Sequence, residues 1–131
     1  MQLGAEVKFT VGTGTLFDST AAKGSVSVVF EDDGTTGYLY AMEPSDEMRL
    51  LDALHIYNVA DVEDRQLPVT AQLFWTVEET AVALLINGYC HALYDFQRQA
   101  GFCRNAFPPA QHGQLLKREL TDELLEQYFA A

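Results

Sequence analysis

The chain has 131 residues, of which 48% are hydrophobic, and its 19 acidic and 8 basic residues give a formal net charge of −11. This length and composition predict a single folded domain over residues 1–131 and argue against a disordered chain. A surface this negative repels nucleic-acid phosphates and anionic lipid headgroups, so we expect binding to neither nucleic acid nor membrane.

The sequence does not show the pattern of an exported protein. It begins MQLGAEVKFTVGTG, without a basic start followed by an apolar run, and its longest apolar run, residues 81–86, is too short to span a bilayer. We therefore expect a cytoplasmic location. Two cysteines, Cys90 and Cys103, make no disulfide framework and are expected to be free thiols.

The first half of the chain begins with three predicted strands. Alternation of polar and apolar residues predicts them over residues 6–11, 25–31 and 37–42. The second and third are joined by the sequence EDDGTTG, in which Gly34 and Gly37 are expected to supply the positive φ angles of a tight hairpin.

A helix is predicted after these strands. Residues 44–47 break the alternation, and Ser45 or Asp46 is expected to cap a helix that runs to about Asn58. At 3.6 residues per turn, one face of this helix would carry Leu50, Leu51, Leu54 and Tyr57.

The second half predicts an antiparallel meander and a terminal helix. Strands are expected over residues 70–77, 80–86 and 89–96, with Asn87-Gly88 as a two-residue hairpin turn. Thr121 is expected to cap a short helix whose apolar stripe includes Leu120, Leu124 and Tyr128. The predicted fold class is therefore α+β: a mostly antiparallel sheet of about six strands with two helices packed on one face.

The acidic run Glu31-Asp32-Asp33 has two interpretations. It does not fit a calcium loop, because counting back from Gly34 puts Val29 at the first ligand position. It is either a solvated hairpin turn or a polar binding edge. No metal site and no cofactor are expected, because the histidines and cysteines lack the spacing of a zinc site.

Nucleophilic catalysis would require residues from distant parts of the chain. Cys103 would have to meet His91 or His112 through the fold, whereas a small buried thiol is the simpler role. Alternation puts Tyr38 and Tyr40 on one face of their strand, where they belong either to the core or to an aromatic-lined groove.

Arg104 is notable in a chain with few cations. It is expected to form an ion pair with Asp95 or with the acidic turn at residues 31–33; the alternative is a site for an anion.

Four segments resemble a family of small bacterial proteins catalogued as a domain of unknown function. They are VVFEDDGTTGYLYA (28–41), LDALHIYNV (51–59), LLINGYCHALYDF (84–96) and GFCRNAFPP (101–109). The resemblance implies a bacterial cytosolic protein but no established activity. The polar residues inside these segments, together with Tyr38, are our candidate binding residues: Glu31, Asp32, Asp33, Tyr38, His55, Tyr57, Asn58, Asp95 and Arg104.

Two kinds of function follow from these features. The first is a non-enzymatic acidic interaction protein, similar in role to an immunity protein or antitoxin, that binds a basic protein partner. The alternative is a small-ligand-binding domain or hydrolase, in which His55 with Asp95 or Asp52 supplies acid–base chemistry and Arg104 holds an anion. Either a monomer or a homodimer is compatible with the sequence.

Overall fold

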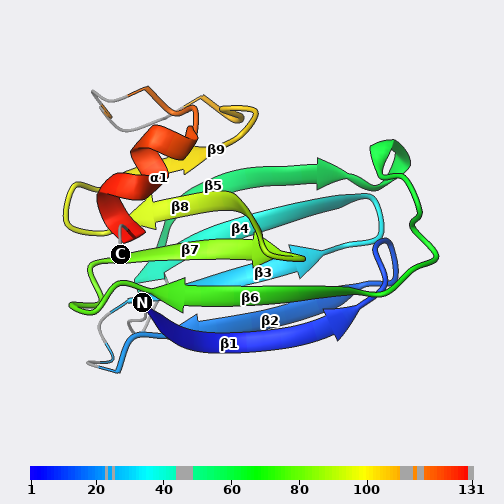
Figure 1. Cartoon of the computed structure of the whole chain (residues 1–131), viewed down its shortest axis with the longest axis horizontal. Helices are drawn as coiled ribbons and strands as arrows, with labels where there is room; N and C mark the ends of the chain where they lie inside the picture. Colours follow the sequence, from blue (N-terminus) through cyan, green and yellow to red (C-terminus); the bar gives the residue numbers. More distant parts are fainter. Residues whose placement is uncertain (23, 25, 44–48, 110–113, 115–116, 130–131) are drawn as a thin grey trace.

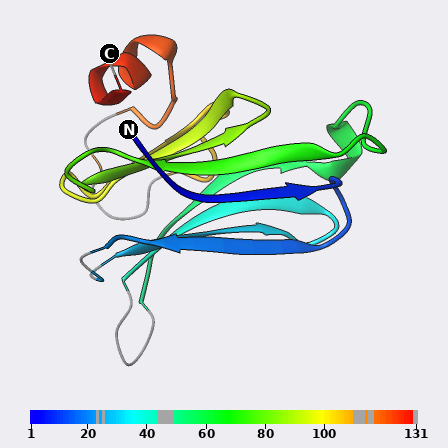
Figure 2. The same cartoon turned by 60° about the horizontal axis from the view of Figure 1, so that its bottom comes forward.

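The chain folds into two antiparallel β-sheets packed face to face (Figures 1 and 2). The computed structural model describes residues 1–22, 24, 26–43, 49–109, 114 and 117–129. The five-stranded sheet has the order β1 (Gln2–Phe9), β6 (Val69–Trp75), β7 (Ala81–Ile86), β8 (Tyr89–Asp95) and β9 (Ala100–Cys103). The four-stranded sheet has the order β2 (Thr15–Thr20), β3 (Ser27–Asp32), β4 (Thr36–Glu43) and β5 (Arg49–Asn58). A short 3-10 helix, η1 (Val59–Asp61), follows β5, and helix α1 (Asp122–Phe129) comes last.

The predicted α+β class is wrong. The described residues form nine strands and one α-helix, so the fold is nearly all-β. All six predicted strands are present, as β1, β3, β4, β6, β7 and β8, but β2, β5 and β9 were missed. The predicted single sheet is also wrong, because the strands divide into two layers that enclose the core.

The main error concerns residues 49–58, which form strand β5 and not a helix. Two irregularities in its pairing with β4 explain the misleading spacing. One of them lies between Gly37 and Tyr38, so that Leu54 and Tyr57, three residues apart, both face the core. A bulge inserts one extra residue and shifts the period-two alternation, which here imitates a helical repeat. The predicted caps, Ser45 and Asp46, lie outside the described residues.

The predicted hairpin turns are present, with one correction. Asn87 and Gly88 have φ angles of 51° and 79°, as a type I′ turn between β7 and β8 requires. Gly34 has a φ of 94° in the β3–β4 turn, but Gly37 is not among the positive-φ residues. Gly37 instead leaves room for a ring, since a Cβ there would lie 2.6 Å from Cζ of Tyr57.

The main core lies between the two sheets. Phe30 is fully buried, and its ring is 5.7 Å from those of Phe9 and Phe17 and 6.2 Å from that of Tyr57. Burying each large apolar side chain of this kind stabilises the fold by about 1.5–3 kcal/mol. Other inward-facing residues are Val28, Leu39, Leu54, Leu73 and Leu84.

Helix α1 covers the outer face of the five-stranded sheet, above the sandwich in Figure 2. The Thr121 hydroxyl accepts a hydrogen bond of 3.1 Å from the Leu124 amide, which confirms the predicted cap. Apolar residues of the helix pack on Leu93 and Phe102, which also confirms the predicted stripe. Within the described chain, no helix is long and apolar enough to cross a membrane.

Candidate functional site

The three acidic residues at the β3–β4 turn, Glu31, Asp32 and Asp33, have different roles. Asp32 is 1% exposed, and its carboxylate accepts hydrogen bonds from the Gly12 amide at 2.7 Å, the Gly34 amide at 2.8 Å and the Tyr57 hydroxyl at 2.6 Å. Burial and the Asp32 carboxylate raise the pKa of Tyr57, so its hydroxyl stays a donor. Asp32 and Tyr57 therefore hold two turns together inside the fold.

Asp33 and Glu31 face solvent but act differently. Asp33 accepts hydrogen bonds from the amides of Thr36 and Thr35, which lower the pKa of its carboxyl group and fix the turn. Glu31 lies on the outer face of the four-stranded sheet, where it accepts a bond of 3.5 Å from the Tyr40 hydroxyl. Of the three acids, Glu31 thus belongs to an open face of the sheet.

Aromatic side chains follow one another across this outer face. Leu39 and Ala41 of β4 are buried, so alternation directs Tyr38 and Tyr40 outward. The rings of Tyr38 and Tyr40 are stacked with centroids 5.9 Å apart.

The neighbouring strand and loop extend these aromatic contacts. The Tyr38 ring meets His55 of β5 edge-on at 5.3 Å, and His55 meets Phe107 at 6.0 Å. We call Tyr40, Tyr38, His55 and Phe107 the aromatic row. Phe107 is 51% exposed, and no helix of the described residues covers this face (Figure 2).

Hydrogen bonds fix the histidine of the aromatic row. The Asn105 amide nitrogen donates to Nδ1 of His55, so the ring proton lies on Nε2, which donates to Asn58 at 3.0 Å. Asn105 is held in turn, because its oxygen accepts from the Phe107 amide at 3.0 Å. The His55 amide also donates to the Phe107 carbonyl, which seats the loop on the edge of β5.

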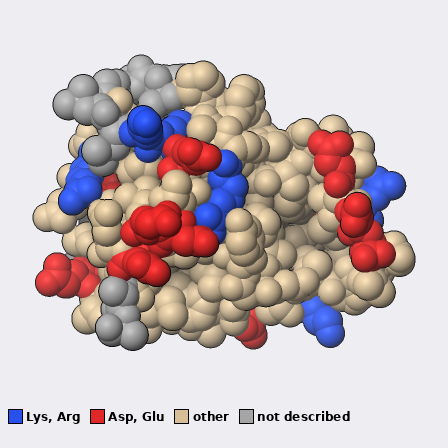
Figure 3. Space-filling view, turned by 45° about the horizontal axis from the view of Figure 1, so that its top comes forward, with Lys and Arg blue, Asp and Glu red and all other residues tan. Residues whose placement is uncertain are grey.

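The same hydrogen bonds connect the aromatic row to carboxylates. Asn58 donates at 3.2 Å to Asp61, which is followed by the exposed Glu63 and Asp64. Figure 3 shows acidic side chains with a basic one among them at this end of the molecule, where residues 59–66 lie, and further acidic side chains among basic ones at the other end. The aromatic row is therefore bordered by Glu31 on one side and by Asp61 on the other.

Arg104 and Asp95 hold helix α1 on the sheet and do not line an open site. Arg104 donates to the carbonyls of Cys90 and Leu120 and pairs with Asp122 at 3.0 Å. Its guanidinium also lies 4.5 Å from the ring centre of Tyr89. Asp95, which is 4% exposed, accepts from the Tyr128 hydroxyl at 2.7 Å and pairs with Arg98 at 3.7 Å.

The three residues of the predicted acid–base site have separate partners. Within the described chain, no hydrogen bond or ion pair joins any two of His55, Asp95 and Arg104. Arg104 pairs with neither Asp95 nor the acidic turn, but with Asp122 of helix α1. Residues 31, 38, 55 and 58 do come together, on the aromatic row and its border.

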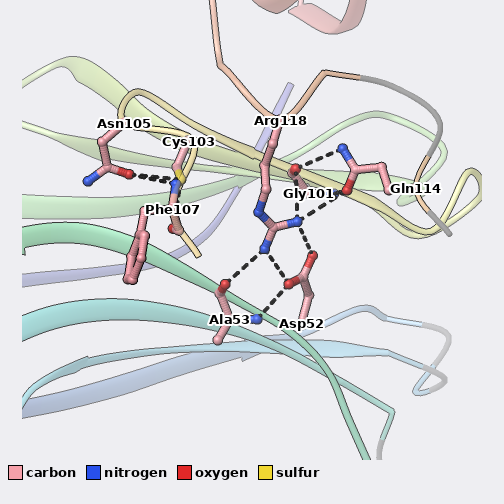
Figure 4. A network of polar contacts seen from close by, with 8 residues as sticks. All are labelled: Asp52, Ala53, Gly101, Cys103, Asn105, Phe107, Gln114 and Arg118. Atoms are coloured by element: carbon pink, nitrogen blue, oxygen red, sulfur yellow. Dashed lines mark hydrogen bonds and ion pairs between the residues drawn. The ribbon is translucent and has the colours of Figure 1, made fainter. Parts of the chain in front are cut away.

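The buried ion pair of Asp52 and Arg118 was not anticipated (Figure 4). Arg118 bonds both carboxylate oxygens of Asp52, one of them at 3.0 Å from Nη1, and also the Ala53 carbonyl at 3.0 Å. Its Nη1 reaches Gln114 at 3.1 Å as well. Because these residues are far apart in sequence, neither spacing nor periodicity could signal the contact.

The thiols do not have the character of nucleophiles. Burial raises the pKa of Cys90 to about 11 and also raises that of Cys103. The Cys103 thiol donates to Asn105 and to the Phe107 carbonyl, which gives it a structural role in the loop. Burial, with the charge of Arg104, lowers the pKa of His91 to about 4, and His112 lies outside the described residues. In the part of the chain that is described, no three His, Cys, Asp or Glu residues are grouped to hold a metal.

Comparison with known proteins supports the resemblance seen in the sequence. Residues 9–129 match the family described as uncharacterized protein conserved in bacteria (DUF2251). An uncharacterized protein of Haemophilus influenzae is 36% identical over 104 residues, which cover 78% of this chain but 65% of that relative's length. No solved structure matches the chain. The predicted membership of a bacterial family of unknown function is thus confirmed, and the chain belongs to the DUF2251 family.

Proposed function

We propose that this chain is a non-enzymatic cytoplasmic protein that binds a basic protein partner, in the way that an immunity protein or an antitoxin does. The binding surface is the outer face of the four-stranded sheet. The observation that carries the proposal is the aromatic row, a continuous set of ring contacts bordered by carboxylates, on a face that no helix of the described residues covers.

The chemistry of this face suits a cationic surface. Tyrosine rings attract guanidinium and ammonium groups over their faces, and they bury a large area at a small cost in side-chain entropy. Glu31 and Asp61 would pair with the same cations at the two borders of the row. The net charge of −11 would further speed the encounter with a basic protein.

The construction of the row favours binding over catalysis. Both ring nitrogens of His55 are occupied by amide groups of Asn58 and Asn105, so the ring is held in place and has no free nitrogen for proton transfer. A rigid aromatic surface loses little freedom on association, which increases affinity. Two buried free thiols are also compatible with a reducing cytoplasm.

The test is capture of the partner followed by a measured affinity. The immobilised chain should retain a basic protein from the lysate of its own bacterium, and the purified partner should bind more weakly as salt is raised. Tyr38→Ser and Phe107→Ser should each weaken binding by about thirtyfold, the loss typical of an interface hot spot. Val77→Ser, which removes a 70% exposed apolar residue outside the row, is the control and should bind as the wild type does.

Two results would overturn the proposal. One is a partner that is acidic, or whose affinity does not change with salt. The other is a basic partner that binds the two row variants as tightly as it binds the wild type. Unfolding midpoints of all variants, measured beside the affinities, separate a lost contact from a lost fold.

A further inference from the structure

A pocket of about 280 Å³ lies next to the aromatic row, where strand β5 meets the chain that follows β8 and β9. It shares no residue with the row. Its lining combines charged, amide and apolar side chains: Glu43, Arg49, Leu50, Asp52, Tyr94, Gln99 and Pro108 are among them. This volume is just below the range of about 300–1,000 Å³ that is usual for ligand pockets, so the pocket has room only for a small organic molecule.

Tyr94 is the residue that points to a ligand. It is 3% exposed and lines the pocket, yet its hydroxyl makes no hydrogen bond to any residue within the described chain. Among the described residues, Nε of Arg118 is the sole buried side-chain nitrogen or oxygen without a partner, so the Tyr94 hydroxyl is not sealed inside the core. It opens instead into the pocket, where a bound molecule can reach it. By contrast, the hydroxyls of Tyr57 and Tyr128 each donate to a buried carboxylate.

The fold makes room for this arrangement at Gly101. Gly101 pairs with Tyr94 across β8 and β9, and a Cβ there would lie 2.6 Å from Oδ2 of Asp52 and 3.0 Å from Cδ1 of Tyr94. The absence of a side chain at residue 101 thus lets Asp52 and Tyr94 come close together. Burial and the charge of Asp52 raise the pKa of Tyr94 to about 12, so the hydroxyl keeps its proton.

The charges around the pocket are balanced, with each carboxylate next to a guanidinium group. The guanidinium of Arg118 neutralises the charge of Asp52, and the Asp52 side chain remains 18% exposed. Glu43 and Arg49 face each other across the β4–β5 pairing. Two carboxylates and two guanidinium groups disfavour a ligand with a large net charge, and they favour one that carries both signs.

We propose that this pocket binds a small zwitterion, a free amino acid. Its ammonium group would donate to the Asp52 carboxylate, its carboxylate would lie toward Arg49, and the Tyr94 hydroxyl would make the hydrogen bond that it lacks within the chain. The apolar walls, Leu50 and Pro108, would contact the amino acid's side chain. This site adjoins the partner surface proposed above but shares no residue with the aromatic row.

The experiment is a titration of the full chain with the common L-amino acids, one at a time, followed by calorimetry and by backbone amide chemical shifts. At least one amino acid should bind with a Kd of about 1 mM or tighter and shift the amides of Ala53, Gln99 and Gly101. Two analogues of that amino acid serve as controls: the amine, which lacks the carboxylate, and the carboxylic acid, which lacks the ammonium group. Each should bind at least about tenfold more weakly than the amino acid.

Two hydroxyl deletions complete the design. Tyr94→Phe should weaken binding by about tenfold and leave the unfolding midpoint unchanged, because this hydroxyl has no partner within the described chain. Tyr128→Phe is the matched control: it removes a hydroxyl bonded to Asp95, so it should lower the midpoint and leave binding unchanged. The proposal is overturned if no amino acid shifts these amides at about 10 mM, if the amine or acid alone binds equally well, or if Tyr94→Phe binds normally.

Discussion

Replacing Arg118 with methionine tests the most buried electrostatic contact of the fold. The Arg118 side chain is 6% exposed and that of Asp52 is 18% exposed, so the substitution leaves a largely buried carboxylate without its cation. Removing one partner of a buried ion pair costs about 3–5 kcal/mol. Because Asp52 keeps some contact with solvent and with the Ala53 amide, we expect the lower end, about 3 kcal/mol.

The assay is urea unfolding followed by the fluorescence of Trp75, the sole tryptophan, which is 2% exposed in the core. A loss of about 3 kcal/mol should lower the urea midpoint by about 1–3 M, since the free energy of unfolding falls by about 1–3 kcal/mol for each molar of urea. A double-mutant cycle combines Arg118→Met, Asp52→Asn and the variant that carries both changes. The double variant should lose about 2 kcal/mol less unfolding free energy than the sum of the losses in the two single variants. Arg98→Met, at a 57% exposed side chain, is the control and should cost under about 1 kcal/mol. Additive effects, or an Arg118→Met loss of under about 1 kcal/mol, would refute the reasoning.

Three further predictions concern the interior. Gly37→Ala should destabilise the chain by about 2 kcal/mol or more in urea unfolding, because its Cβ would lie 2.6 Å from the Tyr57 ring; an unchanged midpoint would contradict the packing described. Lowering the pH from about 6.5 to 4 should cost up to about 3 kcal/mol of stability through His91, since the unfolded chain takes up this proton at a higher pH than the folded chain does. His91→Gln should lose this part of the pH dependence, and an unchanged dependence would count against a half-buried ring that is neutral in the fold. Cys90 and Cys103 should react with a thiol reagent only as fast as the chain unfolds, and rapid modification under native conditions would show that they are accessible.

The strands that the sequence predicts well are those whose alternation is regular. Strands β6, β7 and β8 follow one another through short turns, so local pattern and turn chemistry are sufficient to predict them. Strand β5 contains bulges opposite β4, and bulges are set by tertiary pairing, not by local sequence. Strand β9 has four residues, too few to show a period.

The candidate site shows a similar division between local and tertiary signals. Four of the residues that the sequence singles out, at positions 31, 38, 55 and 58, gather on the aromatic row and its border. The sequence alone cannot tell which of the two neighbouring aspartates is buried. Asp32 is buried and Asp33 is exposed, because the direction of each side chain depends on the sheet to which the turn belongs. Gly101 is the available signal for the pocket, since a glycine inside a strand often marks a close approach of neighbouring groups.

The footprint of the purified partner on the isotope-labelled chain tests the proposed binding face most directly. We predict that the largest amide chemical-shift changes fall on Tyr38, Tyr40, His55 and Phe107, with smaller ones at Glu31 and Asp61. A footprint on helix α1 or on strand β1, with the aromatic row unchanged, would contradict the assignment of partner binding to the outer face of the four-stranded sheet.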